Sequence, residues 1–219
     1  MTVTLNFGQR TAASGQTRSL VVFLHGYGAD GADLLGLADV LAPHLPDTEF
    51  LAPDAPDPCQ GNPFGRQWFP IPWLDGSSDA AARAGLLSAA NSLNLFLDEA
   101  LARTGLGADR LILFGFSQGT MMSLHVAPRR QPAIAGVVAF SGRLLAPELL
   151  ATETLSRPPV LLIHGDADPV VPFGDMQLAG QALTEAGFDT YAHVMKGTGH
   201  GIAPDGLSVA LSFMHERIG

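Results

Sequence analysis

The sequence predicts an α/β fold built on a mostly parallel central sheet with helices on both faces. Short runs rich in leucine and β-branched residues alternate with longer amphipathic patterns, which is the arrangement expected of α/β proteins. Most of the short runs are apolar throughout, as expected of parallel strands that are covered on both faces. A chain of 219 residues with 47% hydrophobic residues can bury one sizeable core, so we expect a single domain over residues 1–219.

Six segments are predicted to be buried strands: 19–26, 48–54, 110–116, 134–142, 159–166 and 189–196. Five segments with apolar residues three and four positions apart are predicted to be helices. They cover residues 31–44, 79–104, 118–128, 174–187 and 203–217. In the second of these helices, the spacing is carried by Leu86, Leu93, Phe96 and Leu97.

Residues 53–78 break this alternation, because they are crowded with Pro and Gly yet rich in aromatic residues. A structureless insert of this length in a compact domain is usually either disordered or a working loop. One interpretation is an irregular surface cover whose aromatic side chains fill gaps over the core. We favour a wall or lid over a binding site, because the segment leaves the carboxyl end of a parallel strand, where α/β proteins bind ligands.

Composition excludes several classes of partner. Twelve Lys and Arg against 21 Asp and Glu give a formal net charge of -9, which would repel nucleic acid and anionic membrane surfaces. The apolar runs are far shorter than the roughly 20 residues that span a bilayer, so no membrane span is expected. Cys59 is the only cysteine, and the first residues lack the pattern of a secretory signal, so we expect a cytoplasmic protein.

The stretch "RLILFGFSQGTMM" places Ser117 between Gly115 and Gly119. A G-x-S-x-G pattern alone is weak, and Ser117 could be a polar residue in a structural turn. Here a buried strand precedes the pattern and a helix follows it, as a nucleophile elbow requires. We therefore interpret Ser117 as a nucleophile.

A serine nucleophile needs a base and an acid that orients the base, and in this type of fold the acid precedes the histidine along the chain. His200 lies in the glycine-rich "KGTGHGIAP" between the last strand and the last helix, where an imidazole can reach across the top of the sheet. Of the other histidines, His25 follows the first predicted strand and His164 ends the fifth. Four more lie in helical or strand patterns, where a structural role is the better interpretation: His44, His125, His193 and His215.

For the acid, "LLIHGDADPVVP" offers both Asp166 and Asp168 directly after a strand. Spacing alone barely separates them. Asp166 could cap the turn, and a metal site with His164 would lack a convincing third ligand. For the oxyanion hole, the N–H of Gln118 is one expected donor, and the glycine-rich "FLHGYGADG" at 23–31 is placed to supply another, although it could also be an ordinary connection.

Taken together, "FLHGYGADG", "GFSQGT", "HGDADPVVP" and "GTGHGI" resemble the carboxylesterase/lysophospholipase family of small α/β-hydrolases, which includes the acyl-protein thioesterases. The motifs occur in the family's order and span residues 23–202. The resemblance implies an α/β-hydrolase fold without a large cap domain. It also implies the site residues: Ser117 as nucleophile, Asp168 rather than Asp166 as acid, His200 as base, and the N–H groups of Tyr27 and Gln118 as the oxyanion hole.

The implied activity is that of a serine carboxylesterase that hydrolyses short to medium acyl esters of small molecules through an acyl-enzyme. No metal or organic cofactor is expected. Trp68 and Phe69 are expected to line the substrate site. Lysophospholipase and acyl-protein thioesterase activities stay open as alternatives, as does the oligomeric state, with a homodimer among the options.

Two further classes fit the sequence less well. A binding module with this fold but no activity would usually have lost a member of the triad, and none is missing here. A dienelactone-hydrolase-like enzyme would use a cysteine nucleophile, and Cys59 lies in the wrong loop for that role.

Overall fold

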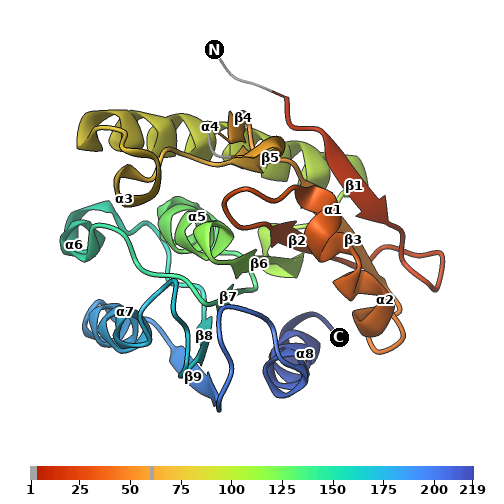
Figure 1. Cartoon of the computed structure of the whole chain (residues 1–219). Coiled ribbons are helices and arrows are strands. Elements are labelled where there is room, and N and C mark those ends of the chain that lie inside the picture. The colour runs from red at the N-terminus through yellow and green to blue at the C-terminus, as the bar shows by residue number, and fades with distance from the viewer. Residues whose placement is uncertain (1–3, 60–61) are drawn as a thin grey trace.

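The computed structural model describes residues 4–59 and 62–219, and its centre is a seven-stranded sheet. The order of the strands across the sheet is β1-β3-β2-β6-β7-β8-β9 (Figure 1). Only β1 runs antiparallel to its neighbour, and the other neighbouring pairs are parallel. The predicted α/β fold with a mostly parallel sheet is confirmed. The strands are β1 (Phe7–Arg10), β2 (Ser19–Leu24), β3 (Thr48–Pro53), β6 (Leu111–Phe116), β7 (Gly136–Phe140), β8 (Val160–Gly165) and β9 (Thr190–Met195).

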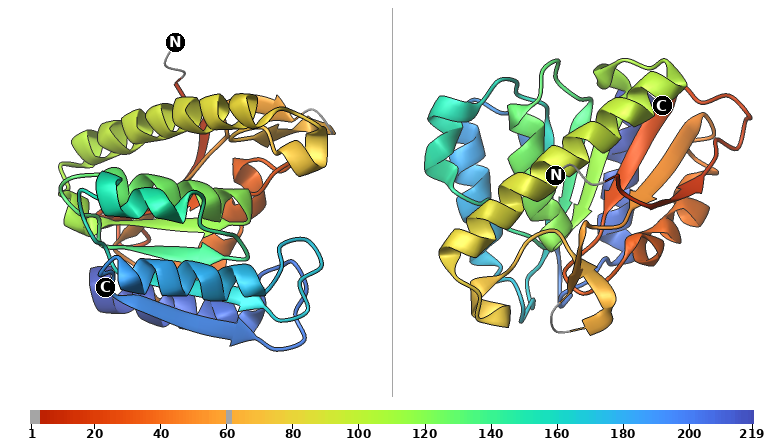
Figure 2. Two further views of the ribbon diagram at one scale, coloured as in Figure 1. Left: turned by 90° about the vertical axis from the view of Figure 1, so that its left-hand side faces the viewer. Right: turned by 90° about the horizontal axis from the view of Figure 1, so that it is seen from above.

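Helices cover both faces of this sheet (Figures 1 and 2). One face packs against α4 (Asp79–Thr104), α5 (Gln118–Val126) and α7 (Gly174–Glu185). The opposite face packs against α1 (Gly31–Leu35), α2 (Leu37–Leu41) and α8 (Pro204–Ile218). Two short helices, α3 (Pro72–Asp75) and α6 (Leu150–Glu153), lie on the same side as α5.

The core divides into two clusters, one on each face, because side chains alternate along each strand. In β2, the side chains of Leu20, Val22 and Leu24 enter the cluster under α4 and α5. Those of Val21 and Phe23 enter the cluster under α1, α2 and α8. All five are fully buried, which explains why this strand is apolar without alternation.

The structure departs from the sequence-based prediction at two elements outside the centre. The helix expected over 31–44 is two short helices separated by Gly36, a poor helix former. Strand β1 was not expected, because its sequence FGQR lacks an apolar run. It lies at the edge of the sheet, where exposed side chains need no apolar pattern.

The segment 53–78 contains more regular structure than expected. An antiparallel hairpin of β4 (Asp57–Cys59) and β5 (Asn62–Gln67) is followed by α3. Residues 60 and 61 lie outside the described residues. The backbone of Gly28 and Ala29 pairs with that of Arg66, so the hairpin is attached to the loop that follows β2.

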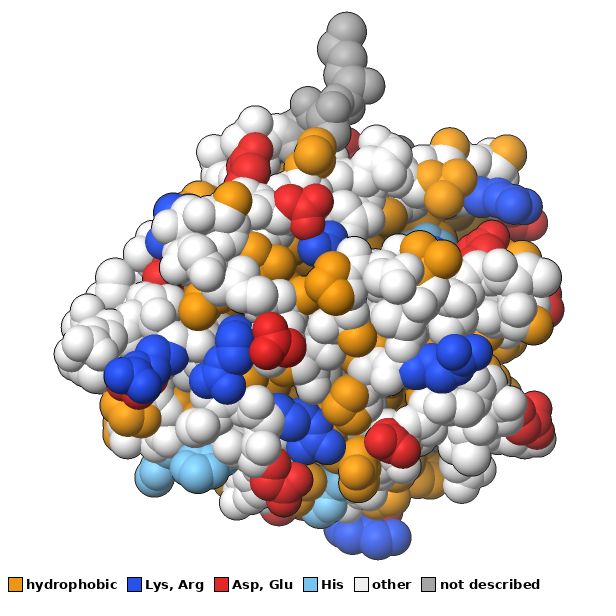
Figure 3. Space-filling view, turned by 180° about the vertical axis from the view of Figure 1, so that it is seen from behind, with side chains coloured by type: hydrophobic (Ala, Val, Ile, Leu, Met, Phe, Trp, Pro, Cys, Tyr) orange, Lys and Arg blue, Asp and Glu red, His pale blue; other side chains and the backbone are white. Residues whose placement is uncertain are grey.

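On the face seen from behind, Lys and Arg side chains are interspersed with Asp and Glu rather than gathered by sign (Figure 3). Among the described helices, none combines the length and the apolar character needed to cross a membrane.

Candidate active site

Ser117 occupies the sharp turn between β6 and α5. Its backbone has φ 54° and ψ -115°, a positive-φ conformation outside the αL region that is unusual for a residue other than glycine. Such a conformation costs about 1–3 kcal/mol and is held by its surroundings. Here the Ser117 N–H donates to Phe140 O (2.9 Å) on the neighbouring strand β7. The turn therefore has the strained geometry of a nucleophile elbow.

The glycines on either side of Ser117 are required by close backbone packing. A Cβ on Gly119 would overlap the carbonyl oxygen of Leu24, and one on Gly115 would lie 2.5 Å from the backbone nitrogen of Thr120. Without these Cβ atoms, α5 can begin directly against the ends of β2 and β6.

His200 and Asp168 lie side by side above the carboxyl ends of β8 and β9. The Nδ1 of His200 is 2.8 Å from Oδ2 of Asp168. The His200 ring also packs against Phe116, the residue before Ser117, with 4.9 Å between ring centroids. Since a carboxylate can only accept, Nδ1 carries the proton and Nε2 of the neutral ring is left with a lone pair.

The side chain of Asp168 is fully buried and held from several directions. Its Oδ1 accepts hydrogen bonds from the backbone N–H groups of Val170 (2.8 Å) and Val171 (3.0 Å). Burial raises the pKa of Asp168, but the hydrogen bonds from His200 and from these two N–H groups outweigh it and hold the pKa below its ordinary value. The carboxyl group is therefore ionised and fixed in orientation near neutral pH.

Asp166 contacts groups other than His200. Its carboxylate accepts a hydrogen bond from the N–H of Gly197 (2.6 Å) and pairs with Lys196 (3.4 Å). The structure therefore brings Asp168, and not Asp166, to the imidazole. Asp166 instead ties the turn after β8 to the turn after β9.

A second histidine, His164, contacts the same carboxylate oxygen of Asp168 as His200 does, and this contact was not expected. Its Nε2 is 2.9 Å from Val171 O and 3.2 Å from Oδ2 of Asp168. Because a carbonyl oxygen only accepts, Nε2 carries the proton and is shared between these two oxygens. The four-residue spacing from His164 to Asp168 was visible in the sequence, but the tight turn that brings the two side chains together was not.

The loop after β2 lies directly beside Ser117. A Cβ on Gly26 would be 3.4 Å from the Cβ of Ser117. His25 fixes this loop from within, since its Nδ1 is 2.8 Å from Gly26 O and its Nε2 accepts from the N–H of Ala55 (3.0 Å). Burial lowers the pKa of His25, in keeping with a neutral ring that both donates and accepts.

Tyr27 and Gln118 are the two residues expected to supply oxyanion donors. Gln118 is the first residue of α5, where helix N–H groups lack partners within the helix. Tyr27 follows Gly26, and its hydroxyl donates to Asp75 of α3 (3.4 Å). Burial raises the pKa of Tyr27, and its neighbours Cys59 and Asp75 raise it further, so the phenol stays protonated.

Trp68 and Phe69, both expected to line the substrate site, are placed differently. Trp68 is fully buried, and its indole N–H donates to His25 O (3.0 Å). Its backbone N–H donates to Oε1 of Gln118 (2.9 Å), while Nε2 of Gln118 donates to Phe69 O (2.7 Å). This clamp by the Gln118 side chain could not be read from the sequence, because the partners lie about fifty residues apart.

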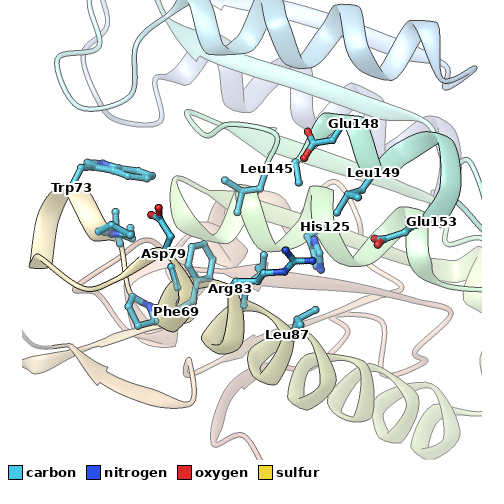
Figure 4. A pocket seen from close by; sticks show the side chains of 16 residues that line it. Phe69, Trp73, Asp79, Arg83, Leu87, His125, Leu145, Glu148, Leu149 and Glu153 are labelled. Carbon is cyan, nitrogen blue, oxygen red and sulfur yellow. The ribbon is translucent and has the colours of Figure 1, made fainter.

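Phe69 lines a largely apolar cavity of about 350 Å³ beside α5, and Trp68 is not among its lining residues. The walls come from residues 69–73, from α4 and α5, and from residues between 145 and 153, which reach into α6. Figure 4 shows Phe69 and Trp73 at one end and His125 with Glu153 at the other.

Arg143 lies over the Trp73 ring at 5.0 Å and pairs with Asp175 of α7. Through these two contacts, Arg143 connects α3 to α7.

This fold places the protein in the class of α/β-hydrolase-fold proteins. A model of the phospholipase/carboxylesterase family matches residues 11–218, and the chain belongs to this family. It is similar to esterase YpfH of Escherichia coli, with 29% identity over 92% of this chain and 84% of that protein. It is also 30% identical to acyl-protein thioesterase 1 of Saccharomyces cerevisiae, over 96% of this chain and 98% of that protein.

Among solved structures, that of esterase PE8 superimposes with a TM-score of 0.93 at 46% identity, over 98% of this chain and all of the other. These findings confirm the family that the sequence motifs indicated. The protein is a carboxylic ester hydrolase.

Proposed function

We propose that the protein is a serine carboxylesterase that hydrolyses short to medium acyl esters, with Ser117 as nucleophile, His200 as base and Asp168 as acid. The observation that carries this proposal is the hydrogen bond of 2.8 Å from His200 Nδ1 to the buried Asp168, next to a serine in the strained elbow conformation. Asp168 holds His200 in the tautomer whose Nε2 can accept a proton.

In the first half of the reaction, Ser117 Oγ attacks the ester carbonyl and passes its proton to Nε2 of His200. The carbonyl oxygen becomes an oxyanion, which the N–H groups of Tyr27 and Gln118 stabilise; one such donor is worth roughly 2.7–4 kcal/mol of barrier. The tetrahedral intermediate then collapses, the alcohol leaves with the proton from His200, and an acyl-enzyme remains.

In the second half, His200 removes a proton from a water molecule, which attacks the acyl carbonyl. Collapse of the second intermediate breaks the bond to Ser117 Oγ, which regains its proton from His200, and the carboxylic acid is released. Throughout, Asp168 stabilises the imidazolium that forms on His200, and its low pKa keeps it ionised for this task.

The cavity of about 350 Å³ is proposed to take the acyl chain. One wall of the cavity includes Phe69, whose backbone oxygen accepts a hydrogen bond from the side chain of Gln118, the residue after Ser117. The volume and the mostly apolar lining of this cavity are those of a pocket for a small hydrophobic group, with a few polar side chains around it. Lysophospholipase and acyl-protein thioesterase activities remain second candidates, the latter because several relatives are named acyl-protein thioesterases.

A substrate panel tests this proposal. We expect p-nitrophenyl esters of short and medium acids to be turned over with higher kcat/KM than a lysophospholipid or an acylated peptide thioester. A thioester or a lysophospholipid hydrolysed at least tenfold faster than every simple ester would move the assignment to the second candidates. Binding of the esters without turnover would instead indicate a binding module.

A further inference from the structure

His125 lies toward the end of the cavity opposite Trp73 and is an unusual residue to find there (Figure 4). It is 6% exposed, and its Nδ1 has no hydrogen-bond partner in the described part of the chain. A buried polar atom without a partner destabilises a fold, since it has lost its hydrogen bonds to water. Nδ1 has almost no accessible surface, so the ring lines the cavity through its other atoms, and a ligand would meet the imidazole there (Figure 4).

The proposed route of the acyl chain from Ser117 to His125 follows α5. Gln118 and His125 lie seven residues apart on α5, which is about two helical turns or 10.5 Å along the axis. On one side of the route is Phe69, bonded to the Gln118 side chain. On the other side is Leu145, which follows Gly142, and a Cβ on that glycine would lie 2.7 Å from Ser117 O. In the proposed arrangement, an acyl chain attached at Ser117 runs along α5 and ends at the imidazole.

The charged side chains on the cavity lining as a whole favour an uncharged group on such a chain. Burial lowers the pKa of His125 to about 4, assisted by the nearby Arg129, so the ring is neutral at neutral pH. Glu153 is paired with Arg129 at 2.6 Å. The remaining charged residues on the lining are Asp79, Glu148 and Arg83, so an anionic group would meet an excess of negative charge.

We propose that His125 is a specificity-determining residue that hydrogen-bonds an uncharged hydroxyl near the distal end of the acyl chain, so that hydroxyacyl esters are preferred substrates. A neutral imidazole has one donor and one acceptor, and a hydroxyl can serve either. The inference rests on the proposed esterase function and adds the chemical class of the acyl group.

The test compares p-nitrophenyl octanoate with its ω-hydroxy and ω-carboxy analogues in the wild type, His125→Phe and His215→Phe. In the wild type we expect kcat/KM to favour the ω-hydroxy ester over octanoate by about fivefold, the effect of one neutral hydrogen bond. The ω-carboxy ester is expected to be the poorest of the three. In His125→Phe the preference should reverse, because the hydroxyl would be buried against an apolar ring. His215 is an exposed helical histidine far from the cavity lining, so His215→Phe should keep the wild-type ratio.

The outcomes separate the two levels of the proposal. No turnover of any ester by the wild type would overturn the esterase function itself. Turnover with the same hydroxyl-to-alkyl ratio in the wild type and in His125→Phe would overturn only the role of His125. A wild-type preference for the ω-carboxy ester would also overturn it.

A measurement on the wild type alone keeps the inference testable if His125→Phe folds poorly. The hydroxyl is moved one carbon at a time from the end of the octanoyl chain toward the ester. The preference should fall as the hydroxyl leaves the reach of His125, and a ratio independent of position would contradict the inference.

Discussion

The indole N–H of Trp68 donates a hydrogen bond to the backbone oxygen of His25 at 3.0 Å. Since the backbone N–H of Trp68 also bonds the Gln118 side chain, this one buried residue joins the loop after β2 to the start of α5. These are the two segments from which the oxyanion donors are proposed to come. Trp68 therefore holds these two segments together through its hydrogen bonds, whereas Phe69 lines the cavity.

Trp68→Phe removes the indole donor and leaves His25 O without that partner. We expect a fall in kcat/KM of about 10- to 100-fold, because small shifts of a positioned group can reduce rates by this much. The loss should be the same for p-nitrophenyl acetate, butyrate and octanoate. Phe69→Ala is the matched comparison, and its loss should grow with chain length by up to about 0.8 kcal/mol per methylene. A loss of kcat/KM in Trp68→Phe that grows with chain length would show instead that Trp68 contacts the acyl chain.

Asp168→Asn should lower kcat by roughly 10⁴, because an amide favours the wrong tautomer of the His200 imidazole. Asp166→Asn is the control, and its effect on kcat should be small, since Asp166 bonds Gly197 and Lys196 rather than His200. Both variants should show the circular dichroism of the wild type before their rates are compared. A large loss of kcat in Asp166→Asn together with a small loss in Asp168→Asn would refute the assignment of Asp168 as the acid.

The buried His125 should make the fold sensitive to moderately acidic pH. Its pKa is about 4 in the folded chain, against 6.5 for an exposed histidine, so the unfolded state binds the proton first as the pH falls. The free energy of unfolding should therefore decrease between pH 6.5 and 4, by up to about 3 kcal/mol from this residue. Urea titrations across this range should show a weaker pH dependence in His125→Phe than in the wild type. Equal slopes for the two proteins would mean that His125 titrates normally.

Gly119→Ala should destabilise the fold strongly, because the new Cβ would overlap the backbone oxygen of Leu24, an atom that cannot move aside. We expect a loss above about 3 kcal/mol in the free energy of unfolding, the upper range for overpacking. Gly174→Ala is the matched control, since nothing lies within 4 Å of the added Cβ at the start of α7. Similar unfolding midpoints for both variants would show that the elbow tolerates a larger residue.

The parts of the fold that could be predicted are those whose signal is local. The buried strands β2, β6 and β8 carry long apolar runs, so the sheet and its mostly parallel direction followed from the sequence. The edge strand β1 and the β4–β5 hairpin depend on pairing with distant backbone, and their own residues carry no comparable pattern.

The same distinction holds at the site. Ser117 could be chosen as the candidate nucleophile from the sequence because the strand, the glycines and the helix that shape its turn are neighbours in sequence. The choice between Asp166 and Asp168 required family knowledge, since both lie in one turn and only the folded loop shows which of them faces His200. The buried role of Trp68 also required the fold, because its hydrogen-bond partners come from two other loops.

The central claim is that Ser117 is the nucleophile of an ester hydrolase. The most direct test is to treat the wild type and Ser117→Ala with a fluorophosphonate, in the presence of a chelator, and to map the adduct by mass spectrometry while following p-nitrophenyl butyrate hydrolysis. We expect one adduct on Ser117, a loss of activity in step with labelling, and neither labelling nor turnover in Ser117→Ala. Turnover that persists in Ser117→Ala, or an adduct on another residue that accounts for the loss of activity, would contradict the claim.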